Sequence, residues 1–296
     1  MKRLCAVTAF VLLASQSLAG ADIQPKPGTV QKYVYVKTPQ GELAIHVHFP
    51  ADWAEKDQRP AVVFFFGGGW SQGSVTQFEK QAEYLAGRGL VAARADYRVK
   101  SRHNTTPDKC VEDAKAAVRW LRQNAGSLGI DPKRIAAGGG SAGGHIAAAG
   151  TICPGLEAEG QDLSVSAKAN LLVLFNPVLN TTGRAAKIGS EEIAKKISPN
   201  DHLAKDAPPA VIFFGTSDAL LETGQEYLAK AKALGLAAEL HTADGQAHGF
   251  FNKAPWTERT LFHLDEFLAK HGWTKGPPTI KPADSAVLKL ADKSPK

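Results

Sequence analysis

The stretch GGGSAGGHIA, residues 138–147, decides the fold of this 296-residue chain. It follows a short apolar run, opens a helical pattern and surrounds one serine with glycines. Three local structures use glycines in this way: a phosphate-binding loop, a dinucleotide-binding turn and a sharp turn that carries a nucleophilic serine. The rest of the sequence must distinguish among these three.

The first two interpretations fit the sequence poorly. A phosphate-binding loop needs Lys and then Ser or Thr after its last glycine, and here Gly144 and His145 stand instead. Gly138, Gly140 and Gly143 do match the dinucleotide pattern, which remains an alternative. That pattern expects an acidic residue at the end of the next strand, but the acidic residues of this region precede that strand.

The third interpretation takes Gly139, Ser141 and Gly143 as G-x-S-x-G, in which small neighbours allow a strained turn that exposes the serine. A serine needs a base and a group that orients the base. Asp218 follows the apolar run AVIFFG, and His248 follows the last predicted strand. Because parallel strands bring their carboxyl ends to one edge, we expect Ser141, Asp218 and His248 to meet there.

Other residues supply candidate supporting roles. Gly67 and Gly68, in FFFGGGW, and Ala142 are predicted to offer backbone N–H groups to an oxyanion. Trp70 and His145 are candidate residues of the substrate pocket. Asp244 is an alternative acid, but it lies only four residues before His248 in the same loop, too near to orient it independently.

Apolar runs that alternate with helical patterns predict an α/β fold with a mostly parallel, eight-stranded sheet, helices on both faces and an antiparallel hairpin at the amino end. Residues 30–272 are expected to form the catalytic domain, and residues 273–296 a flexible tail, because periodicity is lost and prolines accumulate there. The strands begin near residues 33, 43, 61, 90, 134, 171, 210 and 237; the helices span 78–87, 109–126, 142–152, 223–234 and 257–270.

The first 21 residues have the pattern of a secretory signal peptide: Lys2 and Arg3, an apolar run to Leu13, and small residues before the cleavage site. We therefore expect a secreted or periplasmic protein without stable membrane association. The net charge of +6 resides mostly in this leader and in the tail, so the sequence predicts no nucleic-acid partner. Cys110 and Cys153 are predicted to be free thiols, because the helices that carry them place them far apart.

Together these motifs resemble the α/β-hydrolase superfamily, and within it the hormone-sensitive-lipase-like and acetylxylan-esterase-like (BD-FAE-type) carboxylesterases. The matching stretches include FFGGGW, ADYR, GGGSAGGHIA, SPNDH, PPAVIFFGTSD and AHGF, although Phe66 stands where the family usually has His before the glycines. The resemblance implies the α/β-hydrolase fold and hydrolysis of short acyl esters, such as acetylated saccharides, without a cofactor or metal. A serine peptidase, an acyltransferase and a non-catalytic binding module on the same fold are the alternatives, and the oligomeric state stays open.

Overall fold

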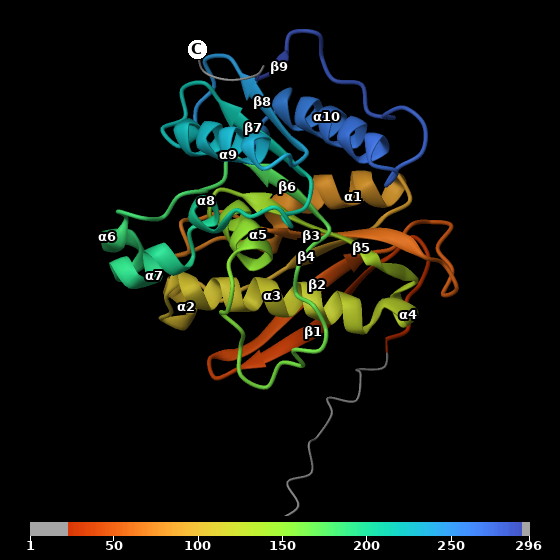
Figure 1. The fold of residues 1–296 in the computed structure, drawn as a ribbon. Helices are drawn as coiled ribbons and strands as arrows, with labels where there is room; N and C mark the ends of the chain where they lie inside the picture. Colours follow the sequence, from red (N-terminus) through yellow and green to blue (C-terminus); the bar gives the residue numbers. More distant parts are fainter. Residues whose placement is uncertain (1–22, 292–296) are drawn as a thin grey trace, which may run out of the picture.

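The computed structural model describes residues 23–291, and the strands of this part form one sheet (Figure 1). The strand order is β1-β2-β4-β3-β5-β6-β7-β8-β9, antiparallel at β1–β2, β2–β4 and β8–β9 and parallel elsewhere. The strands are β1 (Val30–Thr38), β2 (Gly41–His48), β3 (Arg59–Phe65), β4 (Val91–Ala95), β5 (Ile130–Gly140), β6 (Leu171–Phe175), β7 (Ala210–Gly215), β8 (Ala238–Ala243) and β9 (Leu288–Leu290).

Helices cover both faces of this sheet (Figure 1). Alternate residues of a strand point to opposite faces, so the apolar run of β3 divides between two cores. Val63 and Phe65 belong to the core shared with α3 and α5, whereas Val62 and Phe64 belong to the core shared with α1 and α10. The helices are η1 (Val75–Phe78), α1 (Glu79–Gly87), α2 (Lys100–His103), α3 (Pro107–Gln123), α4 (Ala125–Leu128), α5 (Ala142–Ile152), α6 (Ala185–Ile188), α7 (Glu191–Lys196), α8 (Pro199–His202), α9 (Leu221–Ala233), η2 (Phe250–Asn252) and α10 (Trp256–Lys270).

The predicted α/β architecture and its antiparallel hairpin are confirmed, and all eight expected strands are present. The sheet nevertheless has a ninth strand, β9, in the segment that the sequence predicted to be a flexible tail. Leu290 pairs with His241 and Leu288 with Ala243, and Ala286 is fully buried. The prediction of a free tail is therefore wrong at residues 286–290, because the open edge of β8 supplies hydrogen-bond partners that sequence periodicity does not reveal.

Three other predictions concern the cysteines, the membrane and the amino-terminal segment. Cys110 and Cys153 are both buried and unpaired, as predicted. Between residues 23 and 291, none of the helices has the length and apolar character needed to cross a membrane. The signal peptide predicted over residues 1–21 lies outside the described part of the chain.

The topology brings the loops that follow β3, β5, β6, β7 and β8 to one edge of the sheet, because these strands are parallel neighbours. The serine turn lies between β5 and α5, in the middle of this edge. The long connection between β6 and β7 carries the short helices α6, α7 and α8. The predicted site residues therefore come from separate loops that share one rim.

Candidate active site

Ser141 occupies the sharp turn between β5 and α5. Its backbone has φ 52° and ψ −117°, a conformation that residues with a side chain rarely adopt. Hydrogen bonds hold the turn: the Ser141 N–H donates to the Phe175 carbonyl over 2.9 Å, and the His145 N–H donates to the Ser141 carbonyl over 2.9 Å. The strain is thus imposed by neighbouring strand and helix backbone.

The glycines on either side of Ser141 are required by close packing. A Cβ on Gly143 would lie 2.0 Å from the Phe65 carbonyl oxygen, and one on Gly139 would lie 2.4 Å from the same oxygen. Both distances are far below ordinary van der Waals contact, so only glycine lets α5 approach β3 this closely. The G-x-S-x-G spacing therefore has a steric cause in this fold.

Ser141, His248 and Asp218 form a continuous hydrogen-bonded series. The His248 Nε2 lies 2.9 Å from the Ser141 Oγ, and its Nδ1 lies 2.7 Å from the Asp218 Oδ2. The other Asp218 oxygen accepts the Leu220 N–H over 2.9 Å. The Asp218 side chain is 1 % exposed and that of His248 is 43 % exposed, so a buried carboxylate orients a base that substrate can reach. An N–H at Nδ1 directed to Asp218 leaves Nε2 to accept the serine proton.

The competing acid, Asp244, takes no part in this series. Its Oδ1 accepts a hydrogen bond from the Thr216 hydroxyl over 3.3 Å, whereas the His248 Nδ1 faces Asp218. Among residues 23–291, the His, Cys, Asp and Glu side chains form no group of three or more that could hold a metal ion.

Asn176 is a site residue that the sequence reasoning missed. It is fully buried at the end of β6, with φ 36°. Its Oδ1 accepts the Gly249 N–H over 3.1 Å, and its Nδ2 lies 3.4 Å from the His248 Nε2. An asparagine immediately after a buried strand and before a proline was the available signal, because Asn tolerates a left-handed backbone better than most residues.

The predicted oxyanion donors need one correction. The Gly67 N–H donates to the Gln77 Oε1 over 2.6 Å, so it is not the free donor that the sequence predicted. The N–H groups of Gly68 and Ala142 have no hydrogen-bond acceptor within the described residues. Gly68 has φ 132°, and a Cβ there would lie 2.0 Å from the Gln72 carbonyl oxygen. This turn therefore depends on glycine.

Trp70 and His145, the two candidate pocket residues, are both buried. The Trp70 indole N–H donates to the His145 Nδ1 over 3.1 Å, and the His145 Nε2 donates to the Ile197 carbonyl over 2.9 Å. Burial lowers the pKa of His145 to about 4, so the ring is neutral and can accept from Trp70. The pair connects the glycine loop, α5 and the end of α7.

Comparisons with known proteins find similar esterases. Residues 46–183 match the BD-FAE family model. The chain is 27% identical to carboxylesterase NlhH of Mycobacterium tuberculosis, over 72% of each sequence. It is 44% identical to the solved structure of Thermogutta terrifontis esterase 2 phosphoramylated by tabun, with 85% of this chain and 98% of that chain covered and a TM-score of 0.81. The chain belongs to the α/β-hydrolase superfamily of esterases.

A second solved form of the Thermogutta terrifontis esterase has propionate bound; it is 43% identical over 86% of this chain and 98% of that chain, with a TM-score of 0.80. Carboxylesterase activity is therefore established for this chain at the level of reaction class. The dinucleotide-binding alternative is wrong, because the glycines around Ser141 belong to the serine turn of an esterase.

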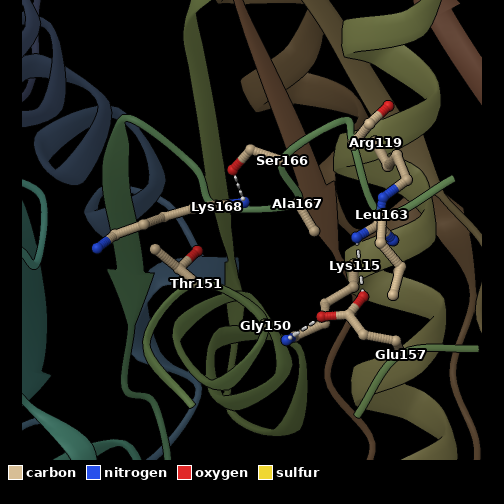
Figure 2. A pocket seen from close by; sticks show the side chains of 10 residues that line it. Lys115, Arg119, Gly150, Thr151, Glu157, Leu163, Ser166, Ala167 and Lys168 are labelled. Carbon is tan, nitrogen blue, oxygen red and sulfur yellow. Dashed lines mark hydrogen bonds and ion pairs between the residues drawn. The ribbon is translucent and has the colours of Figure 1, made fainter. Parts of the chain in front are cut away.

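The esterase also has a cavity of about 360 Å³ at the far end of α5 from Ser141 (Figure 2). Glu157 bridges Lys115 and Arg119 there, with N–O distances of 2.9 Å and 2.8 Å, as the dashed lines in Figure 2 show. Lys168 points away from this group and pairs with Asp206. The two ion pairs of Glu157 join the 153–170 loop to α3, which indicates a structural role.

Proposed function

We propose that this carboxylesterase is a serine hydrolase that removes short acyl groups through an acyl-enzyme on Ser141. The observation that carries the proposal is the series Asp218–His248–Ser141, with contacts of 2.7 Å and 2.9 Å. In this arrangement His248 is the base, and Asp218 holds its tautomer and stabilises the imidazolium. The exposed edge of His248 gives a substrate access to the reacting atoms.

The reaction proceeds in two steps, acylation of Ser141 and hydrolysis of the acyl-enzyme. The Ser141 Oγ bonds to the ester carbonyl carbon while its proton passes to the His248 Nε2, and the resulting oxyanion accepts N–H bonds from Gly68 and Ala142. The C–O bond to the alcohol then breaks, and the proton on Nε2 passes to the leaving oxygen. Water repeats the sequence on the acyl-enzyme and releases the acid, which restores Ser141.

We propose small acyl groups, acetyl foremost, on polar alcohols such as decorated saccharides. The connection over residues 180–208 turns Ile188, Ala194 and Ile197 inward and exposes Lys187, Glu192, Lys195 and Lys196. A charged outer face of this kind differs from the broad apolar cap that suits long acyl chains. The Thermogutta terrifontis esterase has been solved with propionate and with butyrate bound, which is consistent with a small acyl group.

The test is hydrolysis of p-nitrophenyl acetate by Ser141→Ala. We expect kcat to fall by at least about 10³-fold, because the nucleophile is lost. Ser101→Ala, which removes an exposed hydroxyl on α2, is the matched control and should keep full activity. Wild-type protein should also prefer the acetate to the octanoate and react with a fluorophosphonate probe. Retention of activity in Ser141→Ala would refute the assignment, and a preference for octanoate would refute the short acyl group.

We also propose that the protein is exported, on the sequence of residues 1–21. Amino-terminal sequencing of protein recovered from the periplasm or the medium should find a start between residues 20 and 22. An uncleaved chain retained in the cytoplasm would contradict this proposal.

A further inference from the structure

Two side-chain amides meet beside the reacting serine, and no mechanistic step described above uses them. The Gln77 Nε2, on η1, donates to the Asn252 Oδ1, on η2, over 3.1 Å. Gln77 is half-buried and Asn252 is exposed, so both amides are open to solvent on at least one side. Residues 175 positions apart in the chain thus form one polar surface, here named the amide pair.

The amide pair is joined to both halves of the active site. The Gln77 Oε1 accepts the Gly67 N–H over 2.6 Å, and a Cβ built on Gly67 would lie 3.4 Å from the Cβ of Ser141. The Asn252 Nδ2 donates to the Gly249 carbonyl over 3.0 Å, next to His248 in the chain. The amide pair therefore lies between the glycine loop and the histidine loop, on the flank of Ser141 where His248 stands.

The mechanism of ester cleavage places the alcohol of the substrate on the side of Ser141 where His248 lies. His248 must give its proton to the leaving oxygen, so the alcohol has to lie on the Nε2 side of the ring. The amide pair contacts the loop that carries His248, because the Asn252 Nδ2 donates to the Gly249 carbonyl. The leaving alcohol would therefore meet neutral groups that both donate and accept hydrogen bonds.

Gln77 and Asn252 have hydrogen-bond donors and acceptors that the contacts described above do not use. Each primary amide has two N–H donors and two acceptor lone pairs. The contacts described above use one donor of Gln77 and one of Asn252. A second N–H on each residue and spare lone pairs on their oxygens remain for neighbouring hydroxyl groups, which likewise donate and accept.

On these grounds, and resting on the serine esterase mechanism proposed above, we infer that Gln77 and Asn252 form the alcohol subsite. They select neutral alcohols that carry several hydroxyl groups, such as partly acetylated sugars, over apolar alcohols of the same size. An amide has no net charge, so the subsite gives no advantage to anionic or cationic alcohols.

The test compares two acetate esters of similar shape: methyl xylopyranoside with one acetyl group, and cyclohexyl acetate. Both are acetates of secondary alcohols on six-membered rings, and only the first has free hydroxyl groups. We expect wild-type kcat/KM to favour the sugar ester by at least about tenfold, the effect of two ordinary hydrogen bonds. Asn252→Leu should reduce kcat/KM for the sugar ester about tenfold, mainly through KM, and leave cyclohexyl acetate within about twofold.

Gln77→Leu is the second variant, and it is scored by the ratio of the two rates because it also removes the acceptor of the Gly67 N–H. Gln225→Leu, at an exposed glutamine on α9, is the matched control and should leave the ratio unchanged. Cyclohexyl acetate hydrolysis in the same samples reports whether each variant is folded and active.

The outcomes separate this inference from the proposed function. If Asn252→Leu and Gln77→Leu slow both esters equally, the amide pair only positions the two loops and the subsite assignment is overturned. A wild-type ratio near one overturns it as well, while hydrolysis of p-nitrophenyl acetate would leave the esterase mechanism intact. Failure to hydrolyse any of the three esters would instead refute the proposed function, and the subsite with it.

Discussion

Replacing Gly143 by alanine tests whether the glycines of the serine turn act through packing. The new Cβ would lie 2.0 Å from the Phe65 carbonyl oxygen and 2.4 Å from that of Phe66. Ordinary contact begins at 3.4 Å, so α5 or β3 must move by about 1.4 Å in a close-packed interior. Ser141 stands two residues away and moves with the helix. Misplacement of a catalytic group by 1 Å costs about 100-fold in rate, or ~2.7 kcal/mol of transition-state stabilisation.

The assay is kcat/KM for p-nitrophenyl acetate together with the urea midpoint of unfolding. Gly150→Ala is the matched control on the same helix, because its Cβ would find only ordinary contacts at 3.6 Å. That variant should keep wild-type activity and gain about 0.5–1 kcal/mol of stability, as expected for Gly→Ala within a helix. Activity of Gly143→Ala within threefold of wild type would refute the argument that α5 can approach β3 only at glycine.

Three other predictions concern neighbouring groups. His145 is neutral when folded and its pKa is lowered from 6.5 to about 4, so its contribution to stability is complete above pH 6.5 and is lost as the pH falls towards 4. Urea unfolding should show a loss of about 3 kcal/mol from this group over that interval, and His145→Gln should lose less stability on acidification than wild type. Asn176→Gly, which suits φ 36° but removes the bond to the Gly249 N–H, should lower kcat about tenfold on all esters with little change in KM; an unchanged kcat would exclude a positioning role. Gly68→Ala, whose Cβ would meet the Gln72 carbonyl at 2.0 Å, should lower kcat/KM about 100-fold if its N–H is an oxyanion donor, and a normal rate would argue against that role.

The parts of the fold that could be predicted from sequence are those with a strong local pattern. The apolar run of β3 after Arg59 and the five-residue apolar run of β6 indicate central strands, and α3 shows apolar residues at helical spacing. Strand β9 has only three residues, and just one of them, Leu288, is buried. Its place depends on the free edge of β8, which is a tertiary property.

Some features of the active site could likewise be predicted from sequence, and others could not. Ser141, Asp218 and His248 each follow a recognisable strand, so their convergence could be derived from topology. Which glycine N–H is free could not be derived, because that depends on Gln77 reaching the Gly67 N–H from a separate 3₁₀ helix.

For Trp70 and His145, residue type alone did not distinguish a pocket wall from an interior contact. Their positions beside the glycines and the serine fit either role, and the hydrogen bonds to each other and to Ile197 appear only in the folded structure.

The short strand β9 has a practical consequence for handling the protein. It pairs with residues 241–243 of β8, which would otherwise form part of a bare edge, and such an edge can recruit a strand from another molecule. At the opposite border, the outermost strand β1 has a bulge between Val34 and Val36 and presents Lys32 and Lys37 to solvent, two devices that discourage such recruitment. Shortened versions of the chain that stop at the end of α10 would keep the bulge and lysines of β1 but would lack β9. They would therefore expose the edge of β8 and be prone to self-association.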